Sequence, residues 1–205
     1  MPHVSDPAFV VLHALRVKGF ARVDAIAELV CQPVPVLELT LNQLAAAGLA
    51  DFREPRAQWQ LTPAGKESHA TALAADLVGA PLHELKAAYP DFLALNDSFK
   101  ALCSDWQLRD GRPNDHTEVT YDAAIVNRLI ELDGDVTAVC TSFSSALDRF
   151  APYGPRLAAV AQRVGAGERN LFTGVLCGSY HDIWMELHED LIVTLGIDRA
   201  TEGAF

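Results

Sequence analysis

The sequence has no long apolar run, and this absence limits where the protein can work. No stretch approaches the roughly 18–20 apolar residues that a membrane-spanning helix needs, although 50% of the residues are hydrophobic. The first six residues, MPHVSD, have neither the basic region nor the apolar region of a secretory signal. We therefore expect a cytoplasmic protein with a packed core.

Cysteine is also scarce, and the cysteines that occur are widely separated. They form no C-x-x-C pair, which argues against zinc ligands and against a disulfide framework. Such spacing is typical of buried thiols in a reducing compartment. The four residues are Cys31, Cys103, Cys140 and Cys177.

Motifs of catalysis are absent as well. The chain has no Gly-rich phosphate loop, no G-x-S-x-G and no recognisable Ser/His/Asp arrangement. Acidic pairs such as Asp133 and Asp135 alternate along an expected helix, which is typical of a solvated face rather than of an acid/base couple. We therefore predict a protein that is not an enzyme and that binds no cofactor.

Positive charge is sparse and unevenly distributed. Residues 1–70 contain six Lys or Arg and seven Asp or Glu, whereas residues 71–205 contain ten and twenty. Because a nucleic-acid binder needs cations near the phosphates, only the first part is suited to a polyanion. The acidic part should face away from DNA or bind something else.

The stretch 21–67 has the most informative pattern in the chain. Apolar residues recur at helical spacing in 22–30 and again in 34–47, where Leu37, Leu41 and Leu44 form one stripe. Gly48 ends the second helix, as a glycine just past a helix often does. Residues 49–53 and 58–61 then alternate like two strands joined by a turn. Helix, turn, helix and hairpin is the order of a winged helix-turn-helix.

Three short motifs in this stretch resemble MarR-type regulators. They are Leu44-Ala-Ala-Ala-Gly48-Leu49, Arg53-Glu-Pro-Arg56 and Leu61-Thr-Pro-Ala-Gly65-Lys66. In that family they belong to the recognition helix, the wing and the following helix, and the resemblance covers roughly residues 8–75. It implies a DNA-binding transcriptional regulator that forms a homodimer. A shift in the spacing of the two winged domains on effector binding would regulate it.

A first helix is expected at 7–19, and Gly79-Ala-Pro81 separates a winged domain at 1–78 from the rest of the chain at 82–205. The pattern of this second part predicts a helical bundle, and it resembles no family. Pro90 interrupts the apolar stripe of 82–107, which favours two helices or one kinked helix. A polar loop at 108–117 follows, and further helices are expected after it at 121–150, 156–165 and 170–195. The predicted fold class is therefore mainly α, with a small β-hairpin and an antiparallel bundle.

Candidate DNA contacts come from the recognition helix and from cations around it. If Leu37, Leu41 and Leu44 point inward, the outward face carries Val36 and Leu39 but no Lys or Arg. This pattern permits wing-led binding to DNA. It equally permits a module that docks a partner protein through Val36 and Leu39. The candidate DNA-binding residues are Lys18, Arg22, Thr40, Gln43, Arg53 and Arg56.

A small-molecule effector site is the second candidate, in the bundle. Polar and aromatic residues share faces of two expected helices, and such mixtures line ligand pockets. The alternative is a helical core whose polar residues are merely solvated. His181 and His188 are seven residues apart, unlike the spacing of zinc-binding helices, and we predict no metal site. The candidate ligand-binding residues are Asn96, Lys100, Trp106, Arg109, Tyr180, His181, Trp184 and His188.

Overall fold

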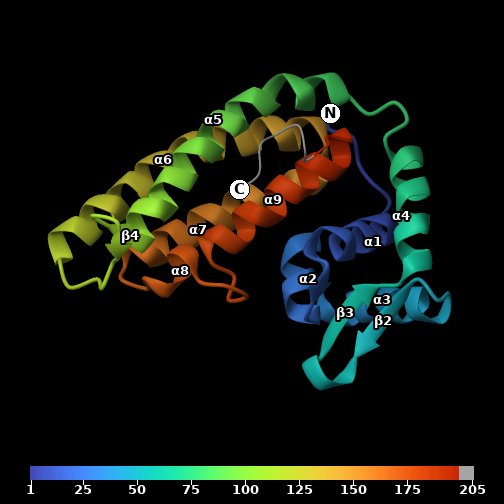
Figure 1. The fold of residues 1–205 in the computed structure, drawn as a ribbon. Coiled ribbons are helices and arrows are strands. Elements are labelled where there is room, and N and C mark those ends of the chain that lie inside the picture. Colours follow the sequence, from blue (N-terminus) through green and yellow to red (C-terminus); the bar gives the residue numbers. More distant parts are fainter. Residues whose placement is uncertain (199–205) are drawn as a thin grey trace. The chain divides into compact units, whose positions relative to one another are not determined.

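The computed structural model describes residues 1–198, which are mainly helical with a small antiparallel sheet (Figure 1). The contacts divide the chain into two compact units. The first comprises 1–82, 144–152 and the segment that begins at Glu186, and the second comprises 83–143 and 153–185. The sequence patterns place a boundary at 79–81, but they contain no sign that two later segments belong to the first unit.

Four helices form most of the first unit, and each begins where local chemistry favours it. Asp6 caps the first, since its carboxylate accepts hydrogen bonds from the N–H groups of Ala8 and Phe9 at 2.9 and 3.1 Å. Gly19, with φ +72°, ends that helix. The bounds are α1 Pro7–Lys18, α2 Val23–Val30, α3 Val34–Ala46 and α4 Pro63–Asp76.

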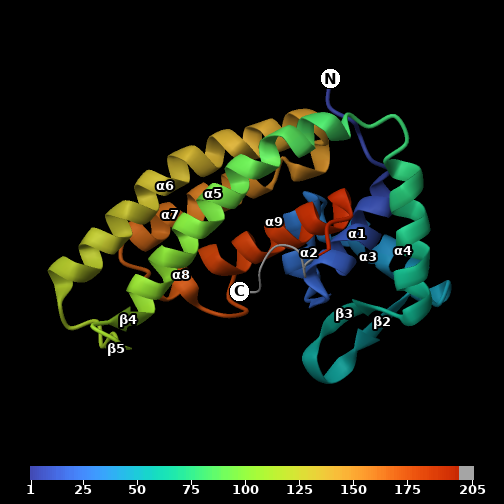
Figure 2. The same cartoon turned by 45° about the horizontal axis from the view of Figure 1, so that its top comes forward.

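The sheet of the first unit has three short antiparallel strands in the order β1-β3-β2. They are β1 Phe20–Ala21, β2 Ala50–Arg53 and β3 Gln58–Leu61. The β2–β3 hairpin, closed by the short helix Glu54–Arg56, extends away from the helices of its unit in both views (Figures 1 and 2). Both hairpin strands were expected from the sequence, whereas β1 was not, because two residues are too few to show an alternating pattern.

The core of the first unit lies where the apolar stripes of its helices meet. Val11 and Leu15 on α1, Ile26 on α2, and Leu37 and Leu41 on α3 are all fully buried. α1 packs against α2, α3, α4 and β3, so this helix is the centre of the unit. The inward stripe predicted for α3 is therefore confirmed at Leu37 and Leu41.

The second unit is helical apart from a two-stranded hairpin. α5 and α6 run side by side in both views (Figures 1 and 2), and Phe92 contacts Phe143 between them at 6.2 Å. The hairpin β4–β5 follows α5. The bounds are α5 Leu82–Gln107, β4 Leu108–Arg109, β5 Arg112–Pro113, α6 Val119–Ala146, α7 Tyr153–Gly165, α8 Asn170–Thr173 and α9 Tyr180–Leu195.

The prediction of one long helix over 170–195 is wrong. The chain leaves the helical conformation after Thr173, with φ +58° at Leu176 and φ +70° at Gly178. Asp182 stabilises this non-helical segment, because its carboxylate accepts hydrogen bonds from the backbone N–H groups of residues 176–179 at 2.9–3.4 Å. An apolar stripe that continues across a break does not reveal it.

Smaller differences concern Pro90 and the start of α7. α5 continues through Pro90 as one helix, which settles one of the alternatives left by the sequence. α7 begins at Tyr153 rather than at 156, so residues 153–155 are its first turn and not a separate connection. Pro155 is compatible with a first turn, where its missing N–H would have no helical partner. Within the described residues, none of the helices is both long and apolar enough to cross a membrane.

Candidate nucleic-acid interface

The outward face of α3 is exposed and lacks positive charge. Val36 and Leu39 are 51% and 66% exposed, while Gln43 is also exposed and Thr40 is half-buried. The Thr40 hydroxyl contacts the carbonyl of Val36 at 3.5 Å. Asn42 is exposed as well, and the sequence reasoning missed it. The face therefore offers amides and apolar side chains to a partner.

The hairpin tip carries the two arginines of the expected wing. The Arg53 guanidinium lies 3.4 Å from the carboxylate of Asp51, with both side chains more than half exposed. The Gln60 amide oxygen, in its better orientation, accepts from Arg53 at 2.8 Å. Arg56 is exposed and forms no ion pair within the part of the chain that the structure describes. An exposed pair such as Arg53–Asp51 contributes about 0–1 kcal/mol, so a phosphate can replace the carboxylate.

The hairpin is fixed to α4 by a compact junction. The Thr62 hydroxyl donates to the carbonyl of Gly48 at 2.7 Å and accepts from the N–H of Gly65 at 3.0 Å, which caps α4. A Cβ at position 65 would lie 1.9 Å from the carbonyl oxygen of Leu49. The Leu61-Thr-Pro-Ala-Gly65 motif thus has a physical basis: it brings α4 against the end of the α3–β2 connection.

The two cationic residues before α2 differ in how readily they can contact a phosphate. Arg22 is exposed and lies 3.6 Å from the exposed carboxylate of Asp24, a weak pair that a phosphate can also displace. The Lys18 side chain is only 7% exposed and is paired with Glu186 of α9. A contact between Lys18 and a phosphate therefore requires this pair to open.

A chain of buried polar groups also lies within the first unit. His13 of α1 is hydrogen-bonded through Nδ1 to His69 Nε2 at 2.9 Å and through Nε2 to Asp190 Oδ1 at 2.8 Å. All three residues are at most 3% exposed. Burial, and then the charge of nearby His13, lowers the pKa of His69 to about 4, which favours its neutral form.

Arg149 is the second node of this buried network. It donates to Asp76 at 3.0 Å and to the Thr194 hydroxyl at 2.8 Å, and Asp190 lies 3.8 Å away. Although burial opposes ionisation, the pKa of Asp190 is lowered, because His13 and Arg149 stabilise its negative charge. The network joins α1, α4, the 144–152 segment and the end of α9. Sequence reasoning missed it, since its members are far apart in the chain.

Several of the predicted ligand-binding residues are packed into the core of the second unit. Trp184 stacks on Phe92 with ring centroids 5.1 Å apart, and its indole N–H donates to the Asn96 side chain at 2.9 Å. Tyr180 is fully buried and donates to Asp133 at 3.0 Å. Trp106 is buried against Phe172 at 4.9 Å. These side chains meet, but each already contacts protein groups.

The other predicted ligand-binding residues are dispersed. His181 lies at the edge of that cluster, because its ring is 6.3 Å from that of Phe99, which packs against Tyr180 and Trp184 at 5.2 and 4.8 Å. Lys100 lies 3.9 Å from Asp97. His188 is buried in the first unit. Arg109 lies over the Tyr121 ring at 5.1 Å.

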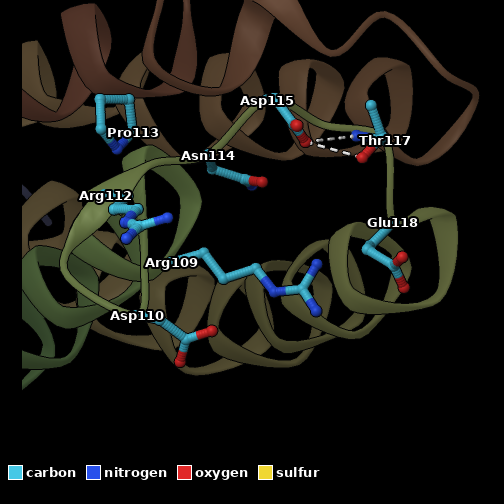
Figure 3. Close-up of a pocket in the computed structure, with 8 residues that line it drawn as sticks. All are labelled: Arg109, Asp110, Arg112, Pro113, Asn114, Asp115, Thr117 and Glu118. Carbon is cyan, nitrogen blue, oxygen red and sulfur yellow. Dashed lines mark hydrogen bonds between the residues drawn. The ribbon is translucent and has the colours of Figure 1, made fainter.

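Arg109 also lines a shallow hollow of about 410 Å³ beside the β4–β5 hairpin (Figure 3). Arg109 extends into it, while the Asp115 carboxylate accepts from the Thr117 N–H and hydroxyl (Figure 3). Asp110, Asp115 and Glu118 place three carboxylates on its wall beside two guanidinium groups. The hollow therefore favours neither an anionic nor a cationic ligand. The full lining is Arg109, Asp110, Arg112, Pro113, Asn114, Asp115, Thr117 and Glu118.

The cysteines are free thiols in two different environments. Burial raises the pKa of both Cys103 and Cys140 to about 12, which makes these thiols unreactive. The prediction of buried thiols is wrong for Cys31 and Cys177, which are exposed. Cys31 ends α2 in a left-handed conformation, and Cys177 lies in the break before α9, where side chains point to solvent.

The described residues contain no cluster of three or more His, Cys, Asp or Glu side chains able to hold a metal ion. Comparisons with protein-family models, curated proteins and solved structures found no match to this chain. Its function must therefore be inferred from its own residues.

Proposed function

We propose that residues 7–76 form a winged helix-turn-helix and that the protein is a DNA-binding transcriptional regulator. The observation that carries the proposal is the exposed outward face of α3, next to a protruding hairpin whose Arg56 has no ion pair among residues 1–198. The order α1-β1-α2-α3-β2-β3-α4 and the sheet order β1-β3-β2 support it. The second unit would serve dimerisation or effector sensing.

The binding mode follows from where charge and amides lie. α3 would enter the major groove with Thr40, Asn42 and Gln43. The amides of Asn42 and Gln43 match the donor and acceptor pattern of adenine, and the Thr40 hydroxyl can bond to either kind of group. Arg53 and Arg56 would reach backbone phosphates or a narrow minor groove. Because few cations take part, we expect weak binding that falls with salt.

The test removes the hairpin cations. Arg53→Ala combined with Arg56→Ala should weaken duplex binding about fivefold or more at low salt and reduce the slope of log K against log salt by about two. Fluorescence anisotropy with labelled genomic fragments measures both quantities. The matched control is Arg112→Ala with Arg163→Ala, which removes two exposed cations from the second unit and should change neither.

A second candidate is a module that docks a partner protein through α3. The exposed pair Val36 and Leu39, together with the absence of Lys and Arg from α3, favours it. If the wild type binds no duplex in a salt-dependent manner, the DNA proposal is wrong. Capture of one stoichiometric partner that is lost with Val36→Asp would then identify the docking module.

A further inference from the structure

Within the first unit, α1 and the part of α9 that begins at Glu186 meet along edges of opposite charge. The acidic edge of α9 consists of Glu186, Glu189 and Asp190. It faces the basic edge of α1, which consists of His13, Arg16 and Lys18. The pairs are His13–Asp190 at 2.8 Å, Arg16–Glu189 at 2.8 Å, and Lys18–Glu186.

These pairs withdraw cations from solvent in a domain that has few of them. Lys18 and Arg16 are two of only six Lys or Arg residues in the first 70. The Lys18 side chain is 7% exposed, and Glu186 is 16% exposed. An ammonium group held this way by a carboxylate cannot also neutralise a phosphate.

Lys18 is nevertheless close in sequence to a cation that is exposed. It is the last residue of α1, and only Gly19 and the two residues of β1 separate it from Arg22 at the start of α2. Its four-carbon side chain can turn outward if the carboxylate stops holding it. Arg16, which is 37% exposed, already reaches solvent in part.

We propose that the acidic edge of α9 is an autoinhibitory contact that competes with DNA phosphates for Lys18 and Arg16. The inference rests on the proposed DNA-binding function and adds its regulation. With the edge in place, binding relies on Arg22 and the hairpin arginines. When α9 is displaced or its charge is neutralised, two further cations reach the phosphates.

The test neutralises the acidic edge while keeping its shape. In the full chain, Glu186→Gln combined with Glu189→Gln keeps hydrogen-bond acceptors opposite Lys18 and Arg16 but removes the charge. We expect duplex binding about fivefold tighter at low salt, and a slope of log K against log salt that is steeper by about one to two. Adding Lys18→Gln to the double variant should remove about half of the gain in slope.

A matched control separates this effect from a general loss of acidity. Glu84→Gln with Glu131→Gln changes the net charge equally on the exposed surface of the second unit, and it should tighten binding less than twofold. Equal affinity and slope for the wild type and the Glu186/Glu189 variant would overturn the inference alone, provided that the wild type binds. An equal gain in affinity for the Glu84/Glu131 control would also overturn the inference. If neither the wild type nor the Glu186/Glu189 variant binds duplex, the proposed function itself fails.

An unfolded variant is recognised by circular dichroism. In that event Glu189→Gln alone, at the more exposed of the two pairs, replaces the double variant. For this single variant, we expect the slope of log K against log salt to be steeper than that of the wild type by about one. An unchanged slope overturns the inference.

Discussion

At position 65 the backbone leaves no space for a side chain. A Cβ there would lie 1.9 Å from the carbonyl oxygen of Leu49, which is backbone and cannot rotate away. Gly65→Ala should therefore lower the free energy of unfolding by about 2–3 kcal/mol, even though alanine is the better helix former. Urea denaturation measures the loss.

The control for this substitution is also in the chain. Gly134 lies within α6, is exposed, and would meet nothing within 4 Å if a Cβ were added. Gly134→Ala should stabilise the protein by up to about 1 kcal/mol through helix propensity. A Gly65→Ala variant as stable as the wild type would show that α4 is not seated against Leu49.

At the scale of single elements, periodicity located most helices but not their interruptions. The inward stripe of α3 was predictable, because Leu37 and Leu41 repeat at helical spacing and the structure buries both. The break before α9 was not found by this criterion, since apolar spacing continues through 170–195. A local signal was present: Ser179-Tyr-His-Asp182 has the S-x-x-D pattern of a capping box. The Ser179 side chain accepts from the Asp182 N–H at 3.0 Å, as that pattern implies.

Asp182 should therefore contribute measurably to the stability of its element. Asp182→Ala removes the acceptor for four backbone N–H groups and should lower the free energy of unfolding by about 1–3 kcal/mol. Asp182→Asn, which keeps part of the acceptor capacity, should cost less. Asp97→Ala, at an exposed carboxylate on α5, is the neutral comparison. Equal stability of all three variants would contradict the capping role.

At the scale of the whole chain, the buried charges could not have been predicted. His13 and Asp190 are 177 residues apart, and Asp76 and Arg149 are 73 apart. In a single sequence, such residues look like isolated polar positions, and no periodic pattern connects them. For the same reason Lys18 was expected to contact phosphates, and its partner Glu186 was not foreseen. The exposed position of Arg53 and Arg56 was easier to predict, because it follows from a local turn between two strands.

A fragment of residues 1–82 should therefore not fold as the full chain does. Without Arg149 and Asp190, Asp76 and His13 each lose an oppositely charged or acidic partner and keep only His3, Ser5 and His69. Removing one partner of a buried charge pair typically costs about 3–5 kcal/mol. We expect no cooperative urea transition for the fragment, followed by circular dichroism and compared with the full chain. A cooperative transition at the midpoint of the full chain would contradict this.

The division of α9 between the two units has a consequence for the order in which the protein matures. Its residues up to Met185 complete the second unit, and those from Glu186 complete the first. During translation, the first 82 residues leave the ribosome long before their last structural component exists. Neither unit can reach its final form until α9 has been made, so residues 1–82 remain incomplete until the segment that begins at Glu186 has been synthesised.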